Sequence, residues 1–178
     1  MLDHIVQRLP NVTHLTLSWC PCPINLPFMA INLPNLQYLT LDHTEEITVG
    51  AGEQPALFSS LVQLSLTRYG TSPMKHGALS CIIHNAPYVH TLIIRGYLIS
   101  KESLDRFTEQ SNQSVISLVT GLRAWDRSHR EQVDHLLALF PNTRCLKLII
   151  VDYSDIRSMR EHHPNVNFIN VKASRYSY

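Results

Sequence analysis

The chain has 178 residues, 44% of them hydrophobic, with 15 lysines and arginines against 14 aspartates and glutamates. This size and composition suit one globular domain with a substantial core. The balanced charge argues against a nucleic-acid binder, which would carry a basic stripe, and no apolar run approaches the roughly 18 residues that a membrane helix needs. We therefore expect no contact with nucleic acid or membrane, and a single domain over residues 1–178 that could be a piece of a longer chain.

The N-terminal segment and the cysteines bear on the cellular compartment. Residues 1–5 lack the basic start and long apolar stretch of a signal peptide. The cysteines are few and scattered, at Cys20, Cys22, Cys81 and Cys145. That pattern is typical of reduced thiols and not of a disulfide framework. We expect a cytoplasmic or nuclear protein with free thiols.

Seven copies of the pattern apolar-x-x-apolar-x-apolar follow one another along the chain. They begin at Val12, Leu36, Leu61, Val89, Val115, Thr143 and Val166, at intervals of 23 to 28 residues. A period in this range is the signature of leucine-rich repeats, with one strand and one return segment in each repeat. Such units stack because they cannot bury their apolar faces alone. The period predicts an α/β fold, a right-handed solenoid arc with about seven parallel strands.

Each predicted strand turns two apolar anchors toward the core, because side chains alternate between the faces of a strand. The anchors are Leu15 and Leu17, Leu39 and Leu41, Leu64 and Leu66, Leu92 and Ile94, Leu118 and Thr120, Leu146 and Leu148, and Ile169 and Val171. Thr120 is a weak anchor because of its hydroxyl. The residues between the anchors are expected to face outward.

The first return segments show little helical pattern. Residues 21–34 hold four prolines, so we expect an irregular stretch or a short tight helix there. Residues 45–54 include Gly50-Ala51-Gly52 and predict a loop, followed at most by a short helix near residues 56–58.

The later return segments predict helices. Ser72-Pro73 has the capping serine and first-turn proline of a helix start, and Ser100 and Ser154 are expected to cap two more helices. The clearest helix covers residues 128–140, where four apolar residues recur at i, i+3, i+4 and i+7: Val133, Leu136, Leu137 and Phe140.

The first repeat carries a family resemblance. Residues 12–20, from Val12 to Cys20, match L-x-x-L-x-L-x-x-N/C, and the cysteine in the last place is similar to the cysteine-containing repeats of F-box substrate receptors. The later equivalents depart from that pattern: Thr44, Tyr69, Tyr97, Val151 and Ser174. The resemblance covers roughly residues 9–173. It implies the substrate-holding part of a ubiquitin-ligase receptor.

The outward positions supply the candidate binding residues. The N-terminal half is mostly polar and contributes Tyr38 and Asp42. The C-terminal half places apolar side chains among basic ones, which suits a protein contact: Ile93, Arg95, Val119, Lys147, Ile149, Phe168 and Lys172. The basic members favour an acidic or phosphorylated partner segment. The alternative explanations are that β-branched residues simply favour strands, or that a missing neighbouring segment covers these side chains.

Three other motifs have simpler explanations than chemistry. Cys20-Pro21-Cys22 lacks the second ligand pair of a zinc site, so no metal is expected. Gly50-Ala51-Gly52 lacks the third glycine of a dinucleotide loop, so no cofactor is expected. His129 and Asp134 stand five residues apart on one predicted helix, which does not bring them face to face.

These observations predict a non-catalytic scaffold that binds another protein, in the manner of the repeats of an F-box receptor. A stand-alone inhibitor or regulator that clamps one protein is the alternative. An enzyme with an unrecognised site is less favoured, because the sequence shows no convergent set of titratable groups.

Overall fold

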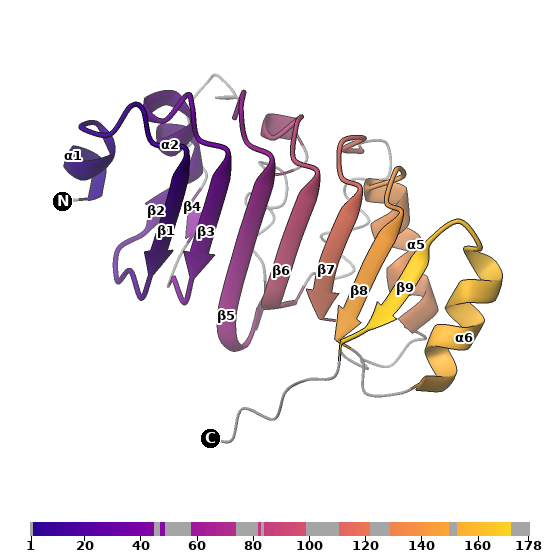
Figure 1. The fold of residues 1–178 in the computed structure, drawn as a ribbon. Coiled ribbons are helices and arrows are strands. Elements are labelled where there is room, and N and C mark those ends of the chain that lie inside the picture. Colours follow the sequence, from indigo (N-terminus) through magenta and orange to yellow (C-terminus); the bar gives the residue numbers. More distant parts are fainter. Residues whose placement is uncertain are drawn as a thin grey trace.

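The computed structural model describes residues 2–44, 47–48, 58–73, 82, 84–98, 111–121, 129–149 and 153–171. Its main sheet has seven strands: β1 (His14–Ser18), β3 (Tyr38–Asp42), β5 (Gln63–Pro73), β6 (Thr91–Leu98), β7 (Ser117–Gly121), β8 (Cys145–Ile149) and β9 (Asn167–Asn170). All neighbours pair in parallel and in chain order. The predicted α/β fold with a seven-stranded parallel sheet is confirmed (Figure 1).

The helices lie on one side of this sheet and at its ends. Those whose bounds the structure describes are α1 (Leu2–Val6), α2 (Leu26–Asn32), α5 (His129–Leu139) and α6 (Tyr153–His162). Figure 1 shows α2 and α5 behind the sheet, and α6 beside β9 at the C-terminal end. A small parallel pair, β2 (Ile24–Asn25) and β4 (Ile47–Thr48), also lies behind it. We call the opposite side of the main sheet the open face.

Helix α2 lies within residues 21–34, for which the sequence predicts either an irregular stretch or a short helix. The Asn25 side chain accepts a hydrogen bond from the Phe28 N–H at 3.1 Å and so caps the helix. Pro27 fits the first turn, where its missing N–H costs nothing. Leu26 and Met29 are buried, so the helix covers the core despite its seven residues.

The two C-terminal helices lie where they were predicted. Val133 and Leu136 of α5 are buried, as the apolar spacing requires. Ile156 and Met159 of α6 are buried as well. Ser154 lies inside α6, which begins one residue earlier, so it is not the capping residue.

The helix start predicted at Ser72-Pro73 is wrong. Strand β5 continues through both residues, which pair with Tyr97 and Leu98 of β6 after a register irregularity. Proline is tolerated in strands beside a bulge, and the register irregularity lies between Thr67 and Ser72, just before Pro73. The predicted helix near Ser100 and most of the loop at residues 45–57 lie outside the described residues.

Two rows of inward anchors form the centre of the core. The residues of both rows in β3 to β8 are at most 2% exposed: Leu39, Leu64, Leu92, Leu118, Leu146, Leu41, Leu66, Ile94, Thr120 and Leu148. Leu15 and Leu17 occupy the same rows in β1 but are half-buried, because β1 is the last strand on its side of the sheet. The predicted register is therefore confirmed for the first six strands.

The predicted register of β9 is wrong by one residue. Phe168 pairs with Leu146 and is 1% exposed, whereas Ile169 pairs with Lys147 and is 37% exposed. The turn before β9 has the same backbone hydrogen bond as those before β1, β3, β6 and β8, here from the Val166 N–H to the His163 carbonyl. One residue fewer, however, separates this turn from its strand. A shift of one residue exchanges the two faces, and the larger phenylalanine takes the core position.

Successive turns are joined by side chains that bond to the backbone of the preceding turn. Ser60 Oγ donates to the Pro34 carbonyl at 2.8 Å, and Ser114 Oγ donates to the Val89 carbonyl at 2.9 Å. Asn112, which is 3% exposed, donates to the carbonyls of Ile82 and Ala86 behind it. These contacts span 25 to 30 residues of sequence, and they join the segments before neighbouring strands through polar groups.

Candidate interaction surface

The outward side chains stand in rows across the open face. The first row is His14, Tyr38, Gln63, Thr91, Ser117, Cys145 and Asn167. The middle row is Thr16, Thr40, Ser65, Ile93, Val119, Lys147 and Ile169. The third row begins with Ser18, Asp42, Thr67 and Arg95. Most of these side chains are short, so the few large ones dominate what a partner can touch.

Two aromatic rings meet at the start of β1 and β3. The rings of His14 and Tyr38, which face each other across the strand pair, lie 4.3 Å apart with planes at 14°. Both residues are exposed. This stack offers a flat aromatic surface at one end of the open face, and Tyr38 was among the predicted binding residues.

A second stack lies just past the other end of the same two strands. The rings of Trp19 and His43 lie 4.4 Å apart, and Trp19 is 66% exposed. Both residues have positive φ, 56° and 52°, which is uncommon outside glycine. Each directly follows one of two paired strands, so equivalent turns after β1 and β3 bring the rings together.

Asp42 holds this second stack in place. Its carboxylate accepts a short hydrogen bond from Thr67 Oγ1 and lies 3.3 Å from His43 Nε2. Its backbone carbonyl accepts a hydrogen bond from the Trp19 N–H at 2.9 Å. An aromatic side chain held by such contacts loses little freedom on binding. We call His14, Trp19, Tyr38 and His43 the aromatic patch.

The predicted C-terminal half of the surface is only partly accessible. Arg95 is exposed, and Ile93 and Lys147 are half-buried on the open face. Ile149 belongs to β8, but its side chain is not described, and Lys172 lies outside the described residues.

Two of the predicted binding residues, Val119 and Phe168, are buried and cannot contact a partner. Phe168 points into the core, as its pairing with Leu146 requires. Val119 stands in the middle row of the open face but is only 4% exposed. A side chain that solvent cannot reach contributes no surface to a partner, so the apolar part of the predicted C-terminal site loses two of its members.

The sequence-based interpretation missed Trp19 and His43 because both lie beyond the strand ends. Counting outward positions within each strand stops at Ser18 and Asp42. The sequence did contain a signal for this stack, because Trp19 and His43 each follow one of two paired residues, Ser18 and Asp42.

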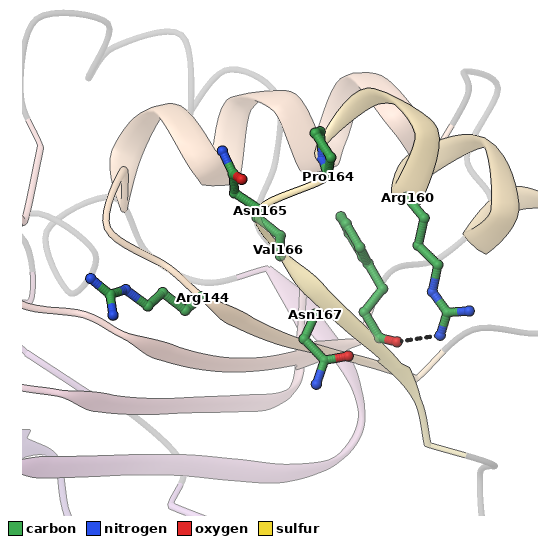
Figure 2. Close-up of a pocket in the computed structure, with 7 residues that line it drawn as sticks. Arg144, Arg160, Pro164, Asn165, Val166 and Asn167 are labelled. Carbon is green, nitrogen blue, oxygen red and sulfur yellow. Dashed lines mark hydrogen bonds between the residues drawn. The ribbon is translucent and has the colours of Figure 1, made fainter.

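A shallow cleft of about 400 Å³ lies at the C-terminal end, lined by Arg144, Arg160, Pro164, Asn165, Val166, Asn167 and Phe168. Figure 2 shows the two arginines on opposite sides of β9, with Arg160 Nη2 donating to the Phe168 carbonyl at 2.8 Å. Their guanidinium groups do not converge on one point. Arginine cannot exchange protons near neutral pH, so this cleft has no acid or base among its lining side chains.

One histidine–carboxylate pair lies near that end. His163 Nε2 is 2.7 Å from Asp134 Oδ1, and the His163 ring packs against Phe168 at 6.2 Å. Asp134 thus contacts a turn residue, whereas the side chain of His129 is not among those described. His135 Nδ1 instead lies 2.7 Å from the Glu131 carbonyl. The pair joins α5 to the turn after α6, and the described contacts of His163 with Asp134 and Phe168 include no serine, threonine or cysteine.

The remaining motifs give no further site. In the described part of the chain, no three His, Cys, Asp or Glu side chains gather as metal ligands. No described helix is long and apolar enough to span a membrane. Gly50-Ala51-Gly52 lies outside the described ranges.

The comparisons with known proteins leave the chain without an assigned family. No protein-family model matches it, and no curated protein is significantly similar to it.

Proposed function

We propose that this chain is a right-handed leucine-rich repeat solenoid that binds another protein through its open face, without catalysis. The observation that carries the proposal is the aromatic patch at the N-terminal end of that face. Tryptophan and tyrosine are enriched among the residues that dominate protein interfaces. Trp19 is 66% exposed, so it has apolar surface that a partner can bury. Its stacking on His43 already restricts the side chain, so binding costs little further conformational entropy.

The repeat architecture is supported by register and spacing. Seven parallel strands follow in chain order, and equivalent residues of the first six repeats face the same way. A parallel crossover is right-handed in nearly all proteins. The resemblance to F-box substrate receptors is supported by Cys20, which packs against the core. Thr44, at the equivalent place after β3, is buried as well but departs from the cysteine pattern.

The contact is centred on the N-terminal half of the open face and not on the C-terminal half. Val119 and Phe168 are inaccessible, whereas all the rings of the aromatic patch lie on two adjacent strands or directly after them. Arg95 and Lys147 on the same face favour an acidic segment in the partner.

The test is affinity capture from a cell extract with matched variants. Trp19→Ala and Tyr38→Ala remove the two largest rings of the patch. Tyr88→Ala is the control, because Tyr88 is 57% exposed but lies in the turn before β6. A protein captured by the wild type and by Tyr88→Ala, and lost with both patch variants, supports the proposal. Equal capture by all variants, or loss only with Arg95→Glu and Ile93→Asp, would move the site elsewhere.

A further inference from the structure

Two thiols lie unusually close together directly after β1. Cys20 Sγ and Cys22 Sγ are 3.0 Å apart, and both side chains are half-buried and free. Only Pro21 separates them, and its ring fixes φ of the intervening residue. The pair is therefore held together by local geometry and remains reachable by small reagents.

The distance between the sulfurs favours a bond between them over a shared metal ion. A tetrahedral zinc with sulfur ligands at about 2.3 Å holds them about 3.8 Å apart, which is wider than the 3.0 Å observed. A disulfide needs about 2.05 Å, so a small rotation of either side chain closes the gap. The described residues also lack the further ligands that a zinc site would need.

We propose that Cys20 and Cys22 are a reversible dithiol–disulfide site that reacts with small-molecule disulfides. The thiolate of one cysteine attacks a sulfur of oxidised glutathione, forms a mixed disulfide and releases one glutathione thiolate. The thiolate of the other cysteine then attacks the cysteine sulfur of that mixed disulfide and releases the second glutathione thiolate. The cysteines lose two electrons, glutathione disulfide gains them, and the two cysteine protons go to the released thiolates.

This disulfide is a reversible one and not a structural support. The loop that it closes is very short, so it removes little chain entropy from the unfolded state. Disulfides that are exposed or strained are the readily reduced ones. The hydrogen bond with Cys20 and partial burial raise the pKa of the Cys22 thiol, so less of it is thiolate at neutral pH. Exchange should therefore accelerate as the pH rises.

The test is a glutathione redox titration of the purified protein, with free thiols trapped by N-ethylmaleimide before digestion with trypsin. The peptide of residues 9–68 contains Cys20 and Cys22 and no other cysteine. We expect this peptide to lose both thiols in one transition, to become two hydrogens lighter without a glutathione adduct, and to recover both thiols with dithiothreitol. Cys145→Ser, which removes a thiol elsewhere, should leave the transition unchanged.

Two variants separate a paired site from independent thiols. In Cys22→Ser the same glutathione ratio should leave a glutathione adduct on Cys20, because no second thiol resolves it. In Cys20→Ala the pKa of Cys22 should fall toward its usual range, and iodoacetamide should alkylate Cys22 several-fold faster at neutral pH. Glutathione adducts on the wild-type peptide, disulfide-linked dimers, or thiols that stay reduced while Cys145 is modified would overturn the proposal.

Discussion

Truncating Phe168 to alanine tests the observed register of β9 against the register that the repeat pattern predicts. Phe168 is 1% exposed and is among the largest fully buried side chains. Removing a buried phenylalanine costs about 3–5 kcal/mol, from lost burial and the cavity that remains. Ile169 is 37% exposed on the open face. Its truncation removes less buried surface and leaves no closed cavity, so we expect a cost of about 1 kcal/mol.

The assay is urea unfolding followed by circular dichroism. With a slope of about 2–3 kcal/mol per molar urea, Phe168→Ala should lower the midpoint by about 1–2.5 M, and Ile169→Ala by less than about 0.5 M. A larger loss from Ile169→Ala than from Phe168→Ala would refute the reasoning, because it would place isoleucine in the core. Equal losses would mean that β9 does not keep one face buried.

The same unfolding assay checks three further predictions. Leu39→Ala should lower the free energy of unfolding by about 2–5 kcal/mol, because Leu39 is fully buried. Thr40→Ala, at the next position of the strand, should lower it far less. Equal losses would show that the register of β3 is wrong. Asn112→Ala should cost about 1–3 kcal/mol, because it removes the buried amide that donates to the Ile82 and Ala86 carbonyls. The exposed Asn142→Ala should be nearly neutral. A neutral result at both sites would remove the structural role given to the buried amide. Asp134→Ala breaks the pair with His163, in which the Asp134 side chain is 46% exposed, so we expect a loss of stability of at most about 1 kcal/mol. A loss of several kcal/mol would contradict the weak coupling expected of an exposed pair.

The fold could be predicted from the sequence because its signal is repeated. A single pattern such as Leu36-x-x-Leu39-x-Leu41 is common by chance, but seven copies at similar spacing predict both the strands and their neighbours. The inward anchors follow from strand alternation alone, and Leu39 and Leu64 are buried as that rule requires.

The errors occur where local preference and packing disagree. Ser72-Pro73 has the local chemistry of a helix start, but pairing with β6 keeps both residues in a strand. Phe168 and Ile169 are both apolar, so the pattern alone could not decide which one enters the core. The turn before β9 has the usual length, but one residue fewer separates it from the strand, and only the three-dimensional register reveals this.

The candidate surface was less predictable than the fold. Exposure depends on neighbouring strands, so Val119 has an outward position and yet is buried. The stack of Trp19 on His43 depends on positive φ at both residues. Neither position holds a glycine that would indicate this backbone conformation from the sequence. The close approach of Cys20 and Cys22 depends on side-chain rotamers as well as on spacing.

Photo-crosslinking from the open face tests the central claim most directly. A benzophenone amino acid would replace Thr16, which is exposed in the middle row of β1 between the two aromatic stacks, and in a second variant Ile31, which is 69% exposed on α2 behind the sheet. After irradiation with the captured partner, we expect a covalent adduct from position 16 and none from position 31. An adduct from position 31 with none from position 16 would show that the partner binds the opposite side, and would contradict the proposal.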